Sequence, residues 1–192
     1  TPRLFEDAAY KYVFRTQATA TMDSVGAALY VIDRNAKVKS VAGLNQNYAW
    51  GQDSWNDFEA AMKVLKPGVE VKTSQMPKLF AGQFGAEIST LLSSNADFIH
   101  SSFWGGDLEA FVLQAAPRNL FRKSTVVLTA GETAMFKLAD KIPDGTVLGA
   151  RGMHGVLAPP SELNKWFRAA YQDRYQLAPV YPAYHMAQAI LG

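Results

Sequence analysis

The sequence contains no cysteine, which excludes disulfide bonds, thiolate metal sites and cysteine nucleophiles. It has no apolar run near the ~20 residues that a membrane-spanning helix needs. It also has no block of five or more like charges, because neutral residues interrupt the nearest cluster, Arg118, Arg122 and Lys123. With a formal net charge of +2, the chain lacks the basic surface typical of nucleic-acid or anionic-membrane binding, so we expect no nucleic-acid partner.

Motifs for catalysis are missing as well. There is no Gly-x-Ser-x-Gly elbow, no Walker loop, and no Gly-x-Gly-x-x-Gly after the first strand. His100 lies inside a predicted strand, where we expect a hydrogen-bonded core histidine, and His154 and His185 are isolated from other ligands. Asp107 and Glu132 could serve as a general acid–base pair, but two carboxylates are a weak indication of catalysis because any chain contains many of them. We therefore predict no metal, no cofactor and no enzymatic activity.

What the sequence does contain is a soluble, globular composition, with 192 residues, 48% of them hydrophobic and 19% charged. Short β-rich runs alternate with amphipathic helical runs, which predicts βαβ units and a doubly wound parallel sheet of the α/β class. The predicted strands cover 12–15, 39–44, 69–75, 97–103, 125–129 and 146–150. The predicted helices cover 24–33, 53–65, 84–94, 107–116 and 133–141, and the first of them should bury Val25, Ala28, Leu29 and Ile32.

The chain changes character after the last predicted strand. We expect one α/β lobe over 17–149, preceded by the end of another lobe and a crossover over 1–16, and followed by a return crossover and helices of that other lobe over 150–192. Ser161 should cap a helix, and a last helix over 183–191 should bury Ala187 and Ile190. These two helices have no sheet of their own, so we expect exposed apolar surface to favour self-association. The residues concerned are Trp166, Phe167, Tyr171 and Tyr175.

Candidate binding residues follow the predicted strands, because ligands of parallel α/β sheets sit beyond the carboxyl ends of the strands. The loops supply aromatic faces, carboxylates and glycines, which is the composition of a small-molecule pocket. The candidates are Tyr48, Trp50, Trp104, Gly105, Gly106, Asp107 and Glu132. Structural alternatives stay open: Asp107 would be a helix cap, and Glu132 would be an acid in the first turn of a helix, favoured by the helix dipole. The two tryptophans, Trp50 and Trp104, would be packing residues at the sheet edge.

Several stretches resemble one protein family. Val13-Phe14-Arg15-Thr16 resembles the stretch before the crossover into the second lobe of branched-chain amino acid-binding proteins of ABC transporters. The segments 38–51 and 103–115 are similar to a strand–loop unit and a Gly-Gly segment of that family. The segment 143–151 resembles its return from the second lobe, and Tyr184 and Ala187 sit where it has a helix of the first lobe.

This resemblance implies a type I periplasmic-binding fold, with two lobes that close on a small-molecule ligand for delivery to a membrane permease. It also implies a periplasmic location, a monomeric full-length protein, and a chain that lacks part of the first lobe. Trp50 would line the cleft, Asp107 stands where amino-acid binders often carry a tyrosine, and Glu132 falls near the acid that receives an ammonium group. Gln83 and Phe84 depart from the family's usual acid and tyrosine, so the ligand could be an amino acid, an amide or an aromatic acid. The alternative is a ligand-sensing effector domain of a regulator or receptor with the same fold.

Overall fold

The computed structural model describes residues 3–6, 8–15, 17–152 and 155–191. Helices and strands alternate through most of this range. The helices are α1 (Arg3–Glu6), α2 (Ala20–Arg34), α3 (Ala49–Leu65), α4 (Gly85–Ser94), α5 (Gly105–Ala115), α6 (Leu120–Lys123), α7 (Glu132–Leu138), α8 (Glu162–Tyr175) and α9 (Tyr181–Leu191). The strands are β1 (Ser40–Leu44), β2 (Glu70–Gln75), β3 (Phe98–Ser101), β4 (Thr125–Leu128) and β5 (Val147–Leu148).

All five strands form one parallel sheet in the order β2-β1-β3-β4-β5. The interior strand β1 is buried along its whole length, whereas the edge strand β2 alternates between exposed and half-buried residues. This contrast is expected, since a central parallel strand is covered on both faces and an edge strand is not. The predicted α/β sheet is therefore confirmed.

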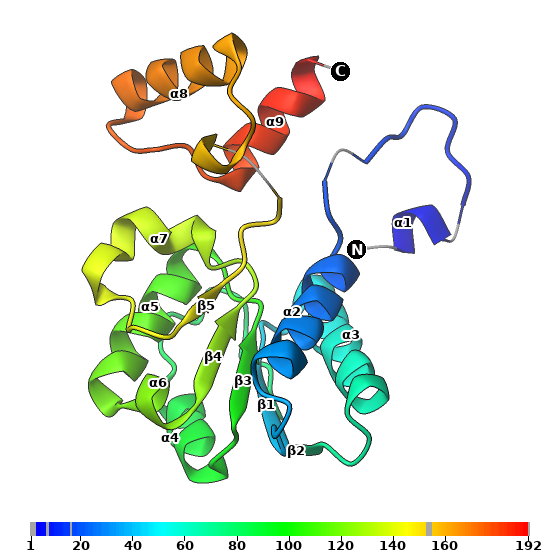
Figure 1. The fold of residues 1–192 in the computed structure, drawn as a ribbon, viewed down its shortest axis with the longest axis vertical. Helices are drawn as coiled ribbons and strands as arrows, with labels where there is room; N and C mark the ends of the chain where they lie inside the picture. The colour runs from blue at the N-terminus through cyan, green and yellow to red at the C-terminus, as the bar shows by residue number, and fades with distance from the viewer. Residues whose placement is uncertain (1–2, 7, 16, 153–154, 192) are drawn as a thin grey trace.

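Helices cover both faces of the sheet (Figure 1). Successive strand residues point to opposite faces, so neighbours such as Val127 and Leu128 join different clusters. One cluster packs α2 and α3 against the sheet and contains Trp55, Phe58 and Met62. The other packs α4, α5 and α7 against the opposite face. Two apolar layers thus hold the sheet and fix where its carboxyl edge lies.

His100 lies in the first of these layers, fully buried in β3. Its ring stacks on Phe58 with a centroid distance of 4.4 Å, and neither ring nitrogen has a hydrogen-bond partner among the described residues. Burial lowers the pKa of His100 to about 3, so the imidazole is neutral in the folded chain. The predicted core position is confirmed, but the predicted hydrogen bond is not found.

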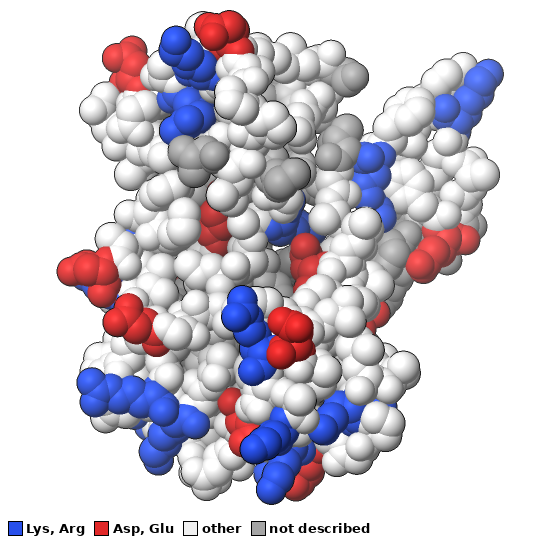
Figure 2. All heavy atoms as spheres, viewed as in Figure 1, with Lys and Arg blue, Asp and Glu red and all other residues white. Residues whose placement is uncertain are grey.

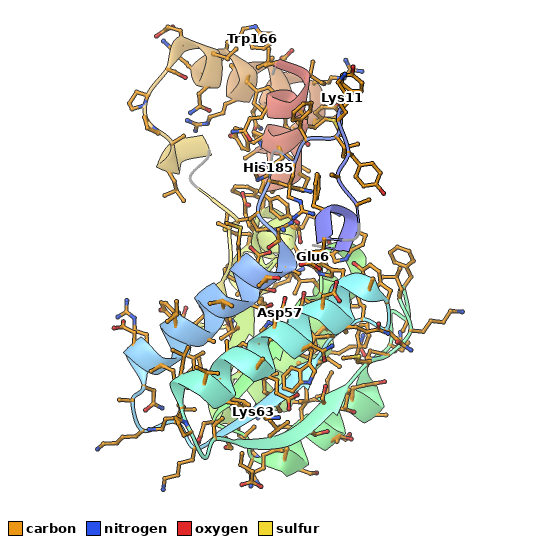
Figure 3. The ribbon with its side chains drawn as sticks, turned by 90° about the vertical axis from the view of Figure 1, so that its right-hand side faces the viewer. Glu6, Lys11, Asp57, Lys63, Trp166 and His185 are labelled. Carbon is orange, nitrogen blue, oxygen red and sulfur yellow. The ribbon has the colours of Figure 1, made fainter. Side chains whose placement is uncertain are left out.

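The last two helices stand apart from the sheet. Figure 1 shows α8 and α9 beyond the end of the sheet. Ser161 caps α8 as predicted, since its Oγ accepts a hydrogen bond from the backbone N–H of Asn164 at 3.1 Å. No described residue of α8 is buried, and Trp166 points away from the sheet (Figure 3). These helices therefore keep the exposed apolar surface expected from the sequence.

Three further sequence predictions, of one strand and two buried side chains, are wrong. Residues 12–15 form no strand, and Phe14 is 81% exposed, because no described strand lies beside them to complete a ladder. Leu29 is 52% exposed, since α2 turns its alanine-rich face, with Ala27 and Ala28, to the sheet. Ile190 is 76% exposed because nothing described covers that side of α9. The predictions for Thr16 and His154 lie outside the described residues.

Charge is spread over the surface without a large patch of one sign. Figure 2 shows basic and acidic side chains interspersed on the visible face, and charged atoms of both signs in the recess between the upper helices and the sheet unit. Within the described ranges, no helix combines the length and the apolar character that a membrane span requires.

Candidate functional site

The carboxyl edge of the sheet brings the loops after β1 and β3 together. In this strand order the connections leave β1 and β3 towards opposite faces, and the point where they diverge is where parallel α/β sheets commonly bind ligands. The Asn45 Oδ1 atom accepts a hydrogen bond from the backbone N–H of Ser102 at 2.9 Å. Trp50 Nε1 donates to the Ser102 carbonyl at 3.1 Å, and Trp104 Nε1 donates to the Tyr48 hydroxyl at 2.8 Å. The two loops are therefore locked together by three hydrogen bonds.

Aromatic side chains form the outer part of this edge. Tyr48, Trp50 and Trp104 are each half-buried, so part of every ring faces outward. The ring of Phe80 meets that of Trp104 edge-on, with centroids 5.9 Å apart. Burial raises the pKa of the Tyr48 phenol, so this hydroxyl stays protonated at neutral pH. Neutral aromatic groups with one polar tip are typical of a small-molecule site.

Trp50 lies in the first turn of α3 rather than in a loop. The predicted helix began at residue 53, but α3 begins at Ala49. The early start depends on Gly51, because a Cβ at that position would lie 2.0 Å from the Gln46 carbonyl oxygen. A helix holds the Trp50 ring more firmly than a loop would.

The Asp107 carboxylate is directed into the protein. It is 3% exposed and lies in the first turn of α5. Its oxygens accept hydrogen bonds from Gln46 Nε2 at 2.7 Å, from the Phe80 N–H at 2.8 Å and from the Gly82 N–H at 3.2 Å. Asp107 therefore ties the loops after β1 and β2 to α5, and it caps no helical N–H.

Gly105 and Gly106 form the start of α5. Gly105 has a φ of 54°, a left-handed conformation that favours glycine, and its N–H donates to Thr133 Oγ1 at 3.2 Å. Gly106 is exposed, and nothing in the described residues lies within 4 Å of a Cβ placed at this position. Because first-turn N–H groups have no partner inside a helix, this turn presents donors at the sheet edge.

Glu132 connects the sheet unit to the last helix. It is 6% exposed at the first position of α7, and its Oε2 atom accepts a hydrogen bond from the Tyr181 N–H at 3.2 Å. Tyr181 is the first residue of α9, where a carboxylate is favoured by the helix dipole. In this arrangement Glu132 binds a backbone N–H of the chain itself.

Arg151, which the sequence analysis did not single out, joins these parts. Its Nε atom lies 2.8 Å from Asp23 Oδ2, and its guanidinium lies 4.7 Å from the centre of the Trp50 ring. Burial raises the pKa of Asp23 to about 6, and the Arg151 charge opposes that rise. A basic residue shortly after the fifth strand was the available signal, since that position lies on the same sheet edge as the predicted loops.

Polar atoms without partners accompany this arrangement. Asn45 Nδ2, Gln46 Oε1 and Ser102 Oγ are buried and find no hydrogen-bond partner within the described parts of the chain. Buried polar atoms normally have partners, so unpaired ones at the carboxyl edge of the sheet would suit a site that binds a polar group. The described residues contain no group of three side chains suited to a metal ion.

A family model for periplasmic binding proteins matches residues 3–192 of this sequence. The chain belongs to this family. The match covers the sheet unit and the last two helices alike, and it confirms the family resemblance inferred from the sequence. No curated protein sequence shows significant similarity to the chain.

Solved structures of this periplasmic binding protein class share its fold. A solute-binding protein of an ABC transporter from Rhodopseudomonas palustris BisB5, in complex with 3,4-dihydroxybenzoic acid, is 23% identical, with a TM-score of 0.72 over 93% of this chain and 48% of that one. A solute-binding protein from R. palustris in complex with benzoate is 18% identical, with a TM-score of 0.70 over 92% and 47%. A leucine-binding protein from Thermotoga maritima MSB8 is 18% identical, with a TM-score of 0.65 over 92% and 51%.

The periplasmic binding protein described here spans about half the length of these structures. The type I fold expected from the resemblance is confirmed, and the assignment of α8 and α9 to a second lobe stays a prediction. The roles of the seven candidate residues stay predictions. The structure brings Tyr48, Trp50, Trp104 and Gly105–Gly106 to one edge, and it directs Asp107 inward.

Proposed function

We propose that this protein captures a small organic solute at the carboxyl edge of its sheet, without converting it chemically, and delivers it to an ABC-transporter permease from outside the cytoplasm. The observation that carries the proposal is the junction of Trp50, Trp104 and Tyr48 through the loops after β1 and β3. It is a rigid, half-exposed aromatic surface at the position where parallel sheets bind ligands. Family membership supports the same reading.

An amino acid, an amide or an aromatic acid would suit this surface. The aromatic rings would cover an apolar body, and the N–H groups at the start of α5 would donate hydrogen bonds to a carboxylate or amide oxygen. Neighbouring structures contain benzoate and 3,4-dihydroxybenzoic acid, and another is a leucine-binding protein. Trp50 would form the wall, Gly105, Gly106 and Trp104 the rim, and Asp107 would hold the loops in place.

The test is a thermal-shift series on the 192-residue chain with leucine, benzamide, benzoate and 4-hydroxybenzoate, followed by titration calorimetry of each compound that raises the melting temperature. Trp50→Ala should weaken binding about tenfold or more, because it removes a buried aromatic contact. Trp166→Ala is the matched control, since Trp166 is 64% exposed on α8. Equal affinity of both variants, or no binding by the wild type, would contradict the proposal.

A further inference from the structure

One side chain contacts every segment that leads into or out of the sheet unit. Arg151 follows β5, and its side chain is 6% exposed. It donates to the Ala18 carbonyl at 2.7 Å, just before α2, and pairs with Asp23 inside α2. It also approaches the Tyr181 hydroxyl at 3.4 Å and lies 5.1 Å from the centre of that ring. The incoming segment, the outgoing segment and the start of α9 therefore meet on one guanidinium.

Arg151 also reaches the proposed binding surface. Its guanidinium lies over the Trp50 ring at 4.7 Å, so the same group contacts the aromatic wall and α9. Tyr181 is held a second time by Glu132, which accepts its backbone N–H at 3.2 Å. Arginine suits this task because its planar fork donates in several fixed directions while its face stacks on aromatic rings. A lysine would supply only the charge.

This junction lies where the start of α9 meets the sheet unit. Apart from the junction, few described contacts connect α9 to the sheet unit, and the strongest of them involve α7. Figure 3 shows His185 on the part of α9 nearest the sheet unit and Trp166 far from it. When two parts of a protein share a small interface, a few residues at the connecting segments decide their orientation.

We propose that Arg151 is a positioning residue that fixes α9 against the sheet edge and thereby holds the solute-binding surface in its capturing geometry. The effect on a ligand rests on the function proposed above. The fixed orientation does not, because every contact that produces it lies within the protein. This separation allows the two ideas to fail independently.

The orientation is measured by electron–electron resonance between two nitroxide labels. Because the chain has no cysteine, Asn56→Cys on α3 and Gln172→Cys on α8 accept the labels without competition, and both positions are exposed. Arg151→Met should lengthen the mean distance and broaden its distribution, measured well below the melting temperature. Arg118→Met is the matched control, because Arg118 also donates two hydrogen bonds, to Gly85 and Ser89, but lies away from α9. It should leave the distribution unchanged.

Two more conservative substitutions can still test the proposal if Arg151→Met does not fold. Arg151→Lys retains a partner for Asp23 but loses the fork, and Tyr181→Phe removes only the hydroxyl acceptor. Both should shift the distance in the same direction as Arg151→Met, by a smaller amount. If every folded variant shows the same label-to-label distance distribution as the wild type, the proposal is wrong. Substituting a residue that only stabilises the fold would change the melting temperature but not the orientation of α9.

The binding measurement uses benzoate and leucine as probes. For a probe that the wild type binds, Arg151→Met should weaken the affinity about tenfold, because the competent orientation becomes a minor population. Unchanged affinity together with a changed distance would refute the link between orientation and capture. If the wild type binds neither probe, the proposed function fails for these two compounds, and the distance measurement alone decides whether Arg151 positions α9.

Discussion

The buried imidazole of His100 predicts an acid-dependent loss of stability. Burial lowers its pKa from 6.5 to about 3 in the folded chain, so the unfolded chain binds the proton more tightly. The stabilising contribution of the neutral ring is therefore complete above pH 6.5 and declines as the pH falls towards 3. Linkage puts the loss at about 2 kcal/mol of unfolding free energy between pH 7 and pH 5.

Asp23 acts in the opposite direction over the same range. Its pKa is raised from 3.8 to about 6, mainly by burial, so its contribution is present at low pH and is lost as the pH rises through 6. Lowering the pH from 7 to 5 therefore regains about 1 kcal/mol from this carboxylate. The net loss in the wild type is expected to be about 1 kcal/mol.

His100→Leu separates the two contributions. Leucine has a similar volume and suits the contact with Phe58, and no hydrogen bond is lost because neither ring nitrogen has one among the described residues. Urea denaturation at pH 7 and pH 5 should show the variant gaining about 1 kcal/mol where the wild type loses about 1 kcal/mol. His185→Gln is the control for a histidine outside the sheet. Identical pH dependence in wild type and His100→Leu would refute the reasoning, and a variant much less stable at pH 7 would mean that the ring is hydrogen-bonded.

Two further substitutions test how the sheet edge is built. Gly43→Ala should lower the unfolding free energy by about 1–3 kcal/mol, since its Cβ would lie 2.4 Å from Trp55 Cε3; an unchanged urea midpoint would show that Trp55 has room to move. Asp107→Ala should cost about 3 kcal/mol, because it leaves the buried Gln46 amide and the partly buried N–H groups of Phe80 and Gly82 without their acceptor. Faster proteolysis of the segment 76–84 should accompany that loss, and a stable, protease-resistant variant would contradict it.

The sheet and its helices could be predicted from the sequence because the burial of one face gives each helix or strand a periodic pattern of apolar residues. In α5 the apolar residues at helical spacing, Leu108, Phe111, Val112 and Ala115, are all buried. Ser161 is likewise a local signal, since a cap is satisfied within three residues. The same logic failed at Leu29 and Ile190, where an apolar side chain matches the period but the described chain offers no surface to cover it.

The candidate site was readable only in part. Parallel strands bring their following loops to one edge, and this placed Tyr48, Trp50 and Trp104 together correctly. The direction of the Asp107 carboxylate was not readable, because its three donors come from residues at sequence distances of 25 to 61. Arg151 was missed for the same reason, since it meets Ala18 across 133 positions. Contacts of that range depend on the assembled fold.

The energetics of the Asp23–Arg151 pair indicate why such a residue would be kept. The two charged groups lie 2.8 Å apart, yet burial still raises the pKa of Asp23 to about 6, so desolvation outweighs the attraction between them. A pair of this kind adds little to the stability of the lobe, and apolar side chains of similar size would serve that purpose as well. Apolar side chains would not fix the orientation of the segments they contact. The Arg151 guanidinium does so because it contacts a carbonyl, a carboxylate and two aromatic rings at once. The cost of burying the pair is therefore understandable if Arg151 serves to orient α9 rather than to stabilise the sheet.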